Sequence, residues 1–212
     1  MVKKEKLITG FVETARLCTH HSLVLCSSGN LSCRINRNEM MITGAGSWMS
    51  ELSQKDVVTC DIRRGKTIRG KNKPSSELHL HRMIYLTRDS ARAILHFQSE
   101  NATAVACNKK ITSINFNVIP EIPFYIGDIG VVPACKPGSL ALAEAVAEQS
   151  KNRRLIVMKN HGIVAIGETL RQAFQMSVFF ELCCKIILVN GNNISTIPPS
   201  ITRYLKEQSS FV

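Results

Sequence analysis

The sequence predicts an α/β fold in which a central β-sheet is covered by helices, and three observations favour it. Stretches with apolar residues at helical spacing alternate along the chain with short apolar runs typical of buried strands. Proline and glycine residues mark the turns between them. No internal repeat, low-complexity tract or linker interrupts the chain, so its 212 residues, 44% of them hydrophobic, are expected to form one domain over residues 1–212.

The first half of the chain is expected to begin with a helix and to continue with two pairs of strands. Apolar residues at helical spacing predict an amphipathic helix over residues 3–21. Short runs bounded by turn residues predict strands at 31–35, 40–43, 57–62 and 67–69. Pro74 then stops the chain and opens a helix that runs through Arg88, with Ser75 or Ser76 as its N-cap.

Helices and strands alternate in the second half. Residues 93–97 form an apolar run typical of a buried strand, and a helix over 101–107 is expected to follow it. Residues 111–135 hold short extended pieces, which prolines and glycines interrupt. The remaining expected elements are a helix from 139 to about 151, strands at 155–158 and 163–166, a long helix over 169–189 and a C-terminal helix over 201–207.

Composition narrows the choice of partners and compartment. A net charge of +11 favours anionic partners such as sugar phosphates, whereas no aromatic residues alternate with the basic ones, so no nucleic-acid partner is expected. The apolar runs are too short or too interrupted for a membrane partner, and no apolar signal segment follows the basic start, which predicts a cytoplasmic protein. The eight cysteines form no Cys-x-x-Cys pair and are expected to be free thiols, with Cys183 and Cys184 as packing residues.

Carboxylate and imidazole side chains recur at positions where they can meet. Glu77 and His81 are four residues apart on an expected helix and can face one cavity. His96 ends a strand, and His161 lies in a turn between two strands. These groups are ligands for a divalent metal, while the two serines before Glu77 suit an anionic phosphate. A metal beside a phosphate pocket indicates carbon chemistry on a phosphorylated small molecule.

Six ordered segments of the chain resemble the class II aldolase/adducin family, and most closely its bacterial L-fuculose-phosphate aldolases. The similarity runs from about residue 5 to residue 190, which is nearly the whole chain. The matching segments are Ser28-Gly29-Asn30-Leu31-Ser32, Ile42-Thr43-Gly44, Pro74-Ser75-Ser76-Glu77 with His81, Ile94-Leu95-His96, Thr103-Ala104-Val105-Ala106 and His161-Gly162. The resemblance implies a class II aldolase/adducin-like fold, a single domain with a central, mainly antiparallel β-sheet covered by helices.

The activity that this resemblance implies is that of a metal-dependent aldehyde-lyase. Such an enzyme would split a ketose 1-phosphate, here expected to be L-fuculose 1-phosphate in fucose degradation, into dihydroxyacetone phosphate and an aldehyde, L-lactaldehyde. The implied cofactor is Zn²⁺ or another divalent cation. The implied assembly is a homotetramer with active sites between subunits.

Roles for individual residues follow from the resemblance alone. Glu77 takes the position of the acid/base carboxylate, which can also contact the metal, and His96 and His161 take metal positions. Tyr204 is expected to be the catalytic C-terminal tyrosine, with Tyr125 as a weaker match. The positions that line the family's phosphate site are Gly29, Asn30, Thr43, Gly44, Ser75 and Ser76.

One metal position departs from the family pattern. The family has His-x-His on the strand of His96, and here the second position is Gln98. Three interpretations stay open: Gln98 binds the metal through its amide oxygen, Glu77 or His81 completes the shell, or metal binding is weak. An amide oxygen suits zinc less well than imidazole does, so we expect a retained site of altered affinity or metal preference, with Gln98 among its ligands.

Three further functions within the same superfamily stay open. A sugar-phosphate 4-epimerase would resemble this chain but carries aspartate after the paired serines, so Glu77 favours the aldolase. A dehydratase that acts on a related ketose phosphate is also compatible with Glu77, so this residue does not separate it from an aldolase. A non-catalytic interaction domain like the adducin head would lack the metal ligands, whereas Glu77, His96 and His161 are all present here.

Overall fold

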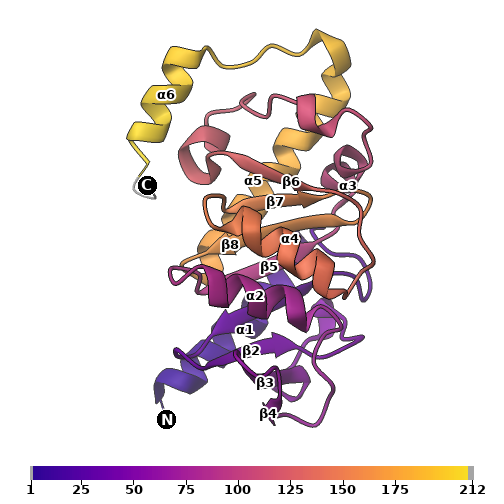
Figure 1. Cartoon of the computed structure of the whole chain (residues 1–212), viewed down its shortest axis with the longest axis vertical. Coiled ribbons are helices and arrows are strands. Elements are labelled where there is room, and N and C mark those ends of the chain that lie inside the picture. Colours follow the sequence, from indigo (N-terminus) through magenta and orange to yellow (C-terminus); the bar gives the residue numbers. More distant parts are fainter. Residues whose placement is uncertain (1, 210–212) are drawn as a thin grey trace.

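Eight strands form one sheet in the computed structural model, which describes residues 2–209 (Figure 1). The strands are β1 (Asn30–Arg34), β2 (Glu39–Thr43), β3 (Val57–Asp61), β4 (Thr67–Arg69), β5 (Ala93–Phe97), β6 (Ile129–Val132), β7 (Leu155–Met158) and β8 (Gly162–Gly167). Their order is β4-β3-β2-β1-β5-β8-β7-β6, and every neighbouring pair is antiparallel except β6 with β7. The predicted α/β fold with a mainly antiparallel sheet is confirmed, and the parallel β6–β7 pair makes the sheet mixed.

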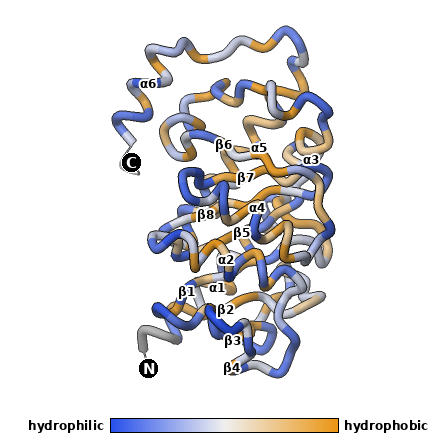
Figure 2. Tube along the Cα trace, viewed as in Figure 1, coloured by the Kyte–Doolittle hydropathy of each residue, from blue (hydrophilic) through white to orange (hydrophobic). Residues whose placement is uncertain are grey.

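Helices cover both faces of this sheet. They are α1 (Val2–His20), α2 (Leu78–Thr87), α3 (Glu100–Ala106), α4 (Leu140–Ser150), α5 (Leu170–Asn190) and α6 (Pro199–Glu207). One apolar cluster joins the sheet to α2 and α4, and a second joins the opposite face to α1, α3 and α5. Both faces of the central strands are therefore buried, and Figure 2 shows apolar residues concentrated along β5, β7 and β8.

Strand β5 illustrates how the two faces are divided. All five of its residues are buried, and Leu95 belongs to the cluster under α1, α3 and α5 whereas Ile94 belongs to the cluster under α2 and α4. Alternation along the strand then places His96 on the same face as Ile94. Residue Asn30 of β1 pairs directly with His96, so the start of β1 brings a second polar side chain to the α2 face.

Two stretches differ from the sequence-based expectation. Helix α2 begins at Leu78 and not at Ser75, because Ser75 bonds through its amide to Thr43 as part of an extended segment, and its hydroxyl accepts a hydrogen bond from the Glu77 amide. In the region 111–135, expected to hold short extended pieces, β6 is such a piece, whereas Ile111–Ser113 forms a 3-10 turn and Ile122–Ile126 forms a π-helical turn. The pairing of β6 with β7 is a long-range contact, which the local pattern does not reveal.

The long apolar helix α5 has the composition of a membrane span but packs into the core. Within the described residues, Leu170–Asn193 is the one stretch long and apolar enough to cross a bilayer, and 39% of its most apolar window is buried. It packs against α3, β5 and β8. Its buried residues include Met176, Phe180 and Cys183, so one face of α5 packs into the core of the chain.

The cysteines are free thiols, as predicted. None of the eight is paired in a disulfide, and Cys183 and Cys184 on α5 are buried. Burial raises the pKa of the Cys183 thiol to about 12, and it raises the pKa of Cys184 as well. Both thiols therefore stay protonated and unreactive at neutral pH, as expected of packing residues.

A carboxylate on α5 caps the helix that follows β5. Both oxygens of Glu181 accept hydrogen bonds, from the Ser99 hydroxyl at 2.5 Å, from the Asn101 amide at 3.1 Å and side chain at 2.7 Å, and from the Ala102 amide at 2.9 Å. Ser99 is fully buried and directly follows Gln98. Glu181 thus holds the chain in place just after the end of β5.

We expect Glu181→Gln to lower the free energy of unfolding by about 2–3 kcal/mol, because hydrogen bonds to a charged acceptor are the stronger kind and the new amide NH₂ would face other donors. Denaturant unfolding of the variant and of wild type measures the difference. Glu100→Gln is the matched control, because Glu100 is an exposed carboxylate in the first turn of α3, the helix that Glu181 caps. Equal stabilities for the two variants would show that Glu181 acts only as a charge near the helix start.

Candidate metal and phosphate site

Three residues distant in sequence bring metal-ligand atoms together at one end of β5. Glu77 precedes α2, His96 is in β5 and His161 precedes β8. Their ligand atoms all lie within 4.8 Å of one another. His96 Nε2 is 3.1 Å from Glu77 Oε2, and His161 Nε2 is 3.4 Å from Glu77 Oε1. A carboxylate between two imidazoles is a ligand set for a divalent cation.

The hydrogen bonds around this triad leave lone pairs facing inward. His96 Nδ1 donates to the Ile163 carbonyl at 3.0 Å, so in the neutral ring Nε2 carries the lone pair that faces Glu77. Glu77 Oε1 is buried and accepts no hydrogen bond from the described residues. Buried lone pairs without a donor are costly. A cation bound between Glu77, His96 and His161 would take up these lone pairs as ligand bonds. The three residues therefore fit a metal.

The protonation states also suit a metal. Burial raises the pKa of Glu77, but His96, the hydrogen bond from Asn30 and the two other nearby histidines together outweigh it, so the pKa is lowered and the carboxylate is ionised. Burial and His96 lower the pKa of His161 despite the opposing effect of Glu77, so its ring is neutral at pH 7. Deprotonated ligands are what a metal requires.

The turn between β7 and β8 positions His161. Its amide donates to the Met158 carbonyl at 3.1 Å, and Asn160 adopts a left-handed conformation with φ of 56° that asparagine tolerates well. A Cβ on Gly162 would lie 2.7 Å from the Phe97 carbonyl oxygen and 3.0 Å from the His96 ring. Only glycine permits this close approach of β8 to the end of β5, which brings the two imidazoles together.

Gln98 lies beside the triad. Its side chain is half-buried, and its Nε2 atom is 3.5 Å from His96 Nε2. Rotation of the amide would turn its oxygen toward the same point, since the two ends of the group differ little in shape. Its role as a metal ligand stays a prediction.

His81 faces the core and not the metal position. Its Nδ1 is 2.6 Å from the Ser32 hydroxyl and its Nε2 is 2.5 Å from Asn30 Oδ1, and the residue is fully buried. Both ring nitrogens are thus occupied by hydrogen bonds. The interpretation in which His81 completes the metal shell does not fit this arrangement.

A cavity of about 190 Å³ opens next to the triad. Glu77, His96 and His161 contribute to its wall. Of the six residues predicted to bind phosphate, those that line it are Gly29, Asn30, Gly44, Ser75 and Ser76. Thr43 is buried beside it, and its hydroxyl accepts a hydrogen bond of 3.4 Å from the Leu31 amide. The structure therefore brings most of the predicted phosphate residues against the predicted metal residues.

Five further residues line this cavity that sequence reasoning missed. They are Ser27, Ala45, Gly46, Ser47 and Pro137. The run Gly44-Ala45-Gly46-Ser47 after β2 carried a usable signal, because small residues in a loop let backbone amides approach an anion. Ser27 and Pro137 lie in other loops, and no local pattern connects them to the site.

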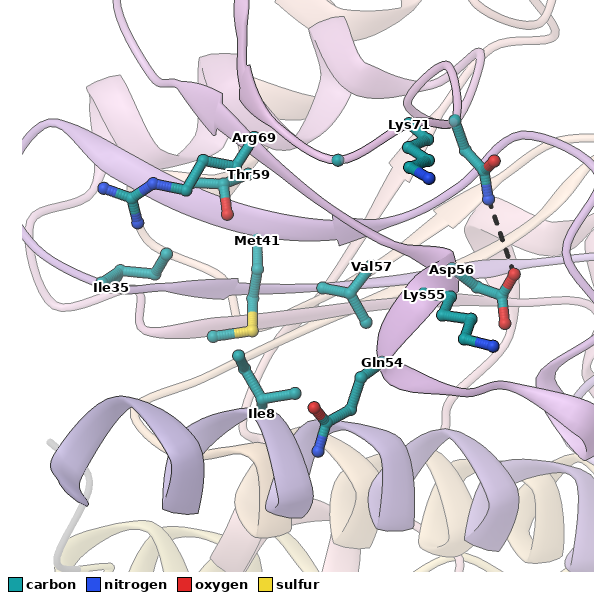
Figure 3. A pocket seen from close by; sticks show the side chains of 12 residues that line it. Ile8, Ile35, Met41, Gln54, Lys55, Asp56, Val57, Thr59, Arg69 and Lys71 are labelled. Atoms are coloured by element: carbon teal, nitrogen blue, oxygen red, sulfur yellow. Dashed lines mark hydrogen bonds between the residues drawn. The ribbon is translucent and has the colours of Figure 1, made fainter. Parts of the chain in front are cut away.

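A larger cavity of about 470 Å³ lies elsewhere, between α1 and the strands β2 to β4 (Figure 3). Apolar side chains such as Ile8, Met41 and Val57 line its inner part, and Arg69 and Lys71 lie at its rim. No histidine lines it, and none of the predicted site residues does. The smaller cavity holds the reactive groups, so we place the candidate site there.

The two tyrosines considered from sequence do not line the smaller cavity that holds the candidate site. Tyr204 is 59% exposed on α6, the helix that extends from the β6 end of the molecule in Figure 1. Tyr125 is half-buried in the π-helical turn and stacks on Phe179, with ring centroids 5.2 Å apart. Neither lines the cavity of its own chain, so a role for Tyr204 would require a neighbouring subunit.

Comparison with known proteins identifies related sequences and structures that cover most of this chain. The model of the family described as Class II Aldolase and Adducin N-terminal domain matches residues 9–188. A Methanococcus vannielii protein named L-fuculose phosphate aldolase is 34% identical over 176 residues, which cover 83% of this chain and 92% of that protein. A Haemophilus influenzae protein named 3-oxo-tetronate 4-phosphate decarboxylase is 28% identical over 178 residues, which cover 82% of this chain and 83% of that protein. A solved structure of an L-fuculose 1-phosphate aldolase has a TM-score of 0.83 and 27% identity, with 95% of each chain covered.

Proposed function

Because the chain belongs to the class II aldolase and adducin family, we propose that it is a metal-dependent aldolase that cleaves a ketose 1-phosphate, with L-fuculose 1-phosphate as the expected substrate. Family membership and the aldolase-named relatives confirm that the chain is a lyase of the class II aldolase family, as predicted. The observation that carries the proposal is the triad of Glu77, His96 and His161 at the wall of a cavity that Ser75 and Ser76 also line.

Substrate binding is assigned to the loops around the cavity. Ser75 and Ser76 precede α2, and the phosphate of a substrate held there would meet their hydroxyls and the positive end of the helix. The small residues from Gly44 to Ser47 leave room for the phosphate to approach the backbone. This placement would direct the sugar carbons toward the triad, which lines the same cavity.

Cleavage then depends on the metal and on one carboxylate. Glu77, His96 and His161 would hold a divalent cation, and Zn²⁺ is the expected one. When bound, the cation supplies Lewis-acid stabilisation of the negative charge that develops on the substrate oxygens. Glu77 is the proton carrier: its ionised carboxylate would take the proton of the substrate C4 hydroxyl as the C3–C4 bond breaks and the aldehyde forms, and would return that proton to C3 of the phosphate-bearing fragment.

The proposal also covers the subunit assembly of the enzyme, its compartment and its metabolic role. We place the enzyme in the cytoplasm, in the carbohydrate metabolism that degrades fucose, as a homotetramer with active sites between subunits. Exposed Ile201 and Tyr204 on α6 support a contact between subunits, since this helix has no fully buried residue in its own chain. Tyr204 of one subunit would then reach the site of another.

A decarboxylase is the second candidate, because a relative of that name covers most of the chain. Loss of carbon dioxide from a 3-oxo acid phosphate also leaves negative charge on oxygens near a metal, so the same residues could serve it. A 4-epimerase and a dehydratase are further candidates within the superfamily, whereas the intact triad argues against a non-catalytic domain.

A product assay distinguishes these functions. The zinc-loaded protein is incubated separately with L-fuculose 1-phosphate and with 3-oxo-tetronate 4-phosphate, and the products are separated from the substrate by chromatography and identified by mass spectrometry. The proposal expects dihydroxyacetone phosphate and L-lactaldehyde from the first. Carbon dioxide from the second, with no cleavage of the first, would identify the decarboxylase, and an isomer of unchanged mass would identify the epimerase.

Gln98→His tests the position that departs from the family. If the Gln98 amide oxygen binds the metal, imidazole should bind zinc more tightly, and we expect roughly a tenfold or greater gain in zinc affinity with cleavage kept or improved. Zinc affinity and turnover are measured together on the same preparations. Unchanged zinc affinity would exclude Gln98 as a ligand. Unchanged metal binding with weaker catalysis would assign its NH₂ to the substrate instead.

A further inference from the structure

A chain of buried hydrogen bonds leads from the Glu77 carboxylate into the protein core. Asn30 Nδ2 lies 3.1 Å from Glu77 Oε2, and Asn30 Oδ1 lies 2.5 Å from His81 Nε2. His81 Nδ1 lies 2.6 Å from the Ser32 hydroxyl, which is 2.9 Å from the Tyr85 hydroxyl. None of the five residues is more than 6% exposed.

The direction of every bond in this chain can be assigned from its Glu77 end. Asn30 Nδ2 donates to Glu77 Oε2, so the Asn30 carbonyl oxygen faces His81. That oxygen can only accept, so the proton of His81 is on Nε2. Burial lowers the pKa of His81 to about 3, so the ring is neutral and its Nδ1 accepts from Ser32. All donors therefore point toward Glu77.

We propose that His81 is a positioning residue that acts through Asn30 to hold the Glu77 carboxylate in its orientation. An amide can turn either end toward a neighbour, and the N–H of His81 selects the orientation of Asn30 that presents NH₂ to Glu77. This inference rests on the role proposed above for Glu77.

The sheet explains why this support is rigid. Asn30 pairs with His96 in the β1–β5 ladder, and Ser32 pairs with Ile94 two residues further along. Asn30 and Ser32 therefore lie on the sheet face that α2 covers, where His81 contacts both of them. Outer partners of this kind orient metal ligands, and their loss typically lowers metal affinity or activity by about 10- to 100-fold.

A matched pair of substitutions separates positioning from packing. The Nε2 of glutamine can occupy the place of His81 Nε2 and donate to Asn30, whereas the shorter asparagine can reach Ser32 but not Asn30. We expect His81→Asn to lower zinc affinity and kcat by about 10- to 100-fold with little change in KM, and His81→Gln to stay close to wild type. Tyr85→Phe removes the far end of the chain and leaves Asn30 and His81 in place, so it should lower stability without changing zinc affinity.

Three measurements on these variants decide the matter: the free energy of unfolding, the zinc dissociation constant of the metal-depleted protein, and the kcat and KM for the ketose phosphate. Equal zinc affinities for His81→Asn and His81→Gln would overturn the positioning role. An equal loss of affinity in Tyr85→Phe at matched stability would do the same, because the effect would then be one of packing. The zinc measurement needs no substrate, so an incorrect aldolase assignment would not be mistaken for failure of this inference.

Discussion

Replacement of Glu77 by glutamine is expected to leave the protein folded and to lower turnover by about 10²- to 10⁴-fold, the usual loss when a positioned acid or base is removed. Glu77 is ionised, borders the cavity and lies 3.1 Å from His96 Nε2 and 3.4 Å from His161 Nε2. Glutamine keeps the shape of the side chain but cannot carry a proton. Turnover of the ketose phosphate is the measurement, with denaturant unfolding as the test of the fold.

Glu144→Gln is the matched control for this change, because Glu144 is an exposed carboxylate on α4 away from the cavity. It should keep both turnover and stability. Near-normal turnover by a folded Glu77→Gln protein would remove Glu77 from the mechanism. A variant that loses turnover because it no longer binds zinc would show that Glu77 acts mainly as a ligand.

Loss of the imidazole of His96 or of His161 is expected to weaken metal binding, because each is a proposed metal ligand. His96→Ala and His161→Ala each remove one of three convergent ligands, so we expect zinc affinity to fall by more than about 100-fold, since outer partners alone contribute 10- to 100-fold. Zinc is titrated into chelator-treated variants and wild type. His20→Ala, a change of an exposed histidine on α1, controls for loss of a histidine elsewhere. Zinc binding as tight as in wild type by both site variants would refute the site.

Much of the fold was predictable because its signals are local. Strand β7 stands out as a short, fully apolar run, and β5 is apolar except for His96, since helices cover both faces of the sheet. Helix α5 shows its length and apolar character directly. The position of β6 was not predictable, because its pairing with β7 depends on contacts across the chain, and Gly130 weakens its strand pattern.

Some residues of the candidate site were predictable from the sequence, and others were not. Glu77, His96 and His161 could be chosen from sequence because chemically distinctive residues lie next to turns and strand ends, and family resemblance supplied their roles. The burial of His81 could not be predicted, because the start of α2 at Leu78 turns His81 toward the core. The contribution of Ser27 also depends on how separate loops fold together.

The dependence of ketose phosphate cleavage on bound zinc is tested most directly by following cleavage and metal content in the same samples. Metal-depleted wild-type protein receives zinc in steps, and the zinc bound per chain is measured together with the release of dihydroxyacetone phosphate from L-fuculose 1-phosphate. We expect no cleavage without metal and a rate that rises in proportion to bound zinc until each chain holds one ion. Cleavage at full rate by the metal-depleted protein, or no dihydroxyacetone phosphate once one zinc is bound per chain, would contradict this expectation.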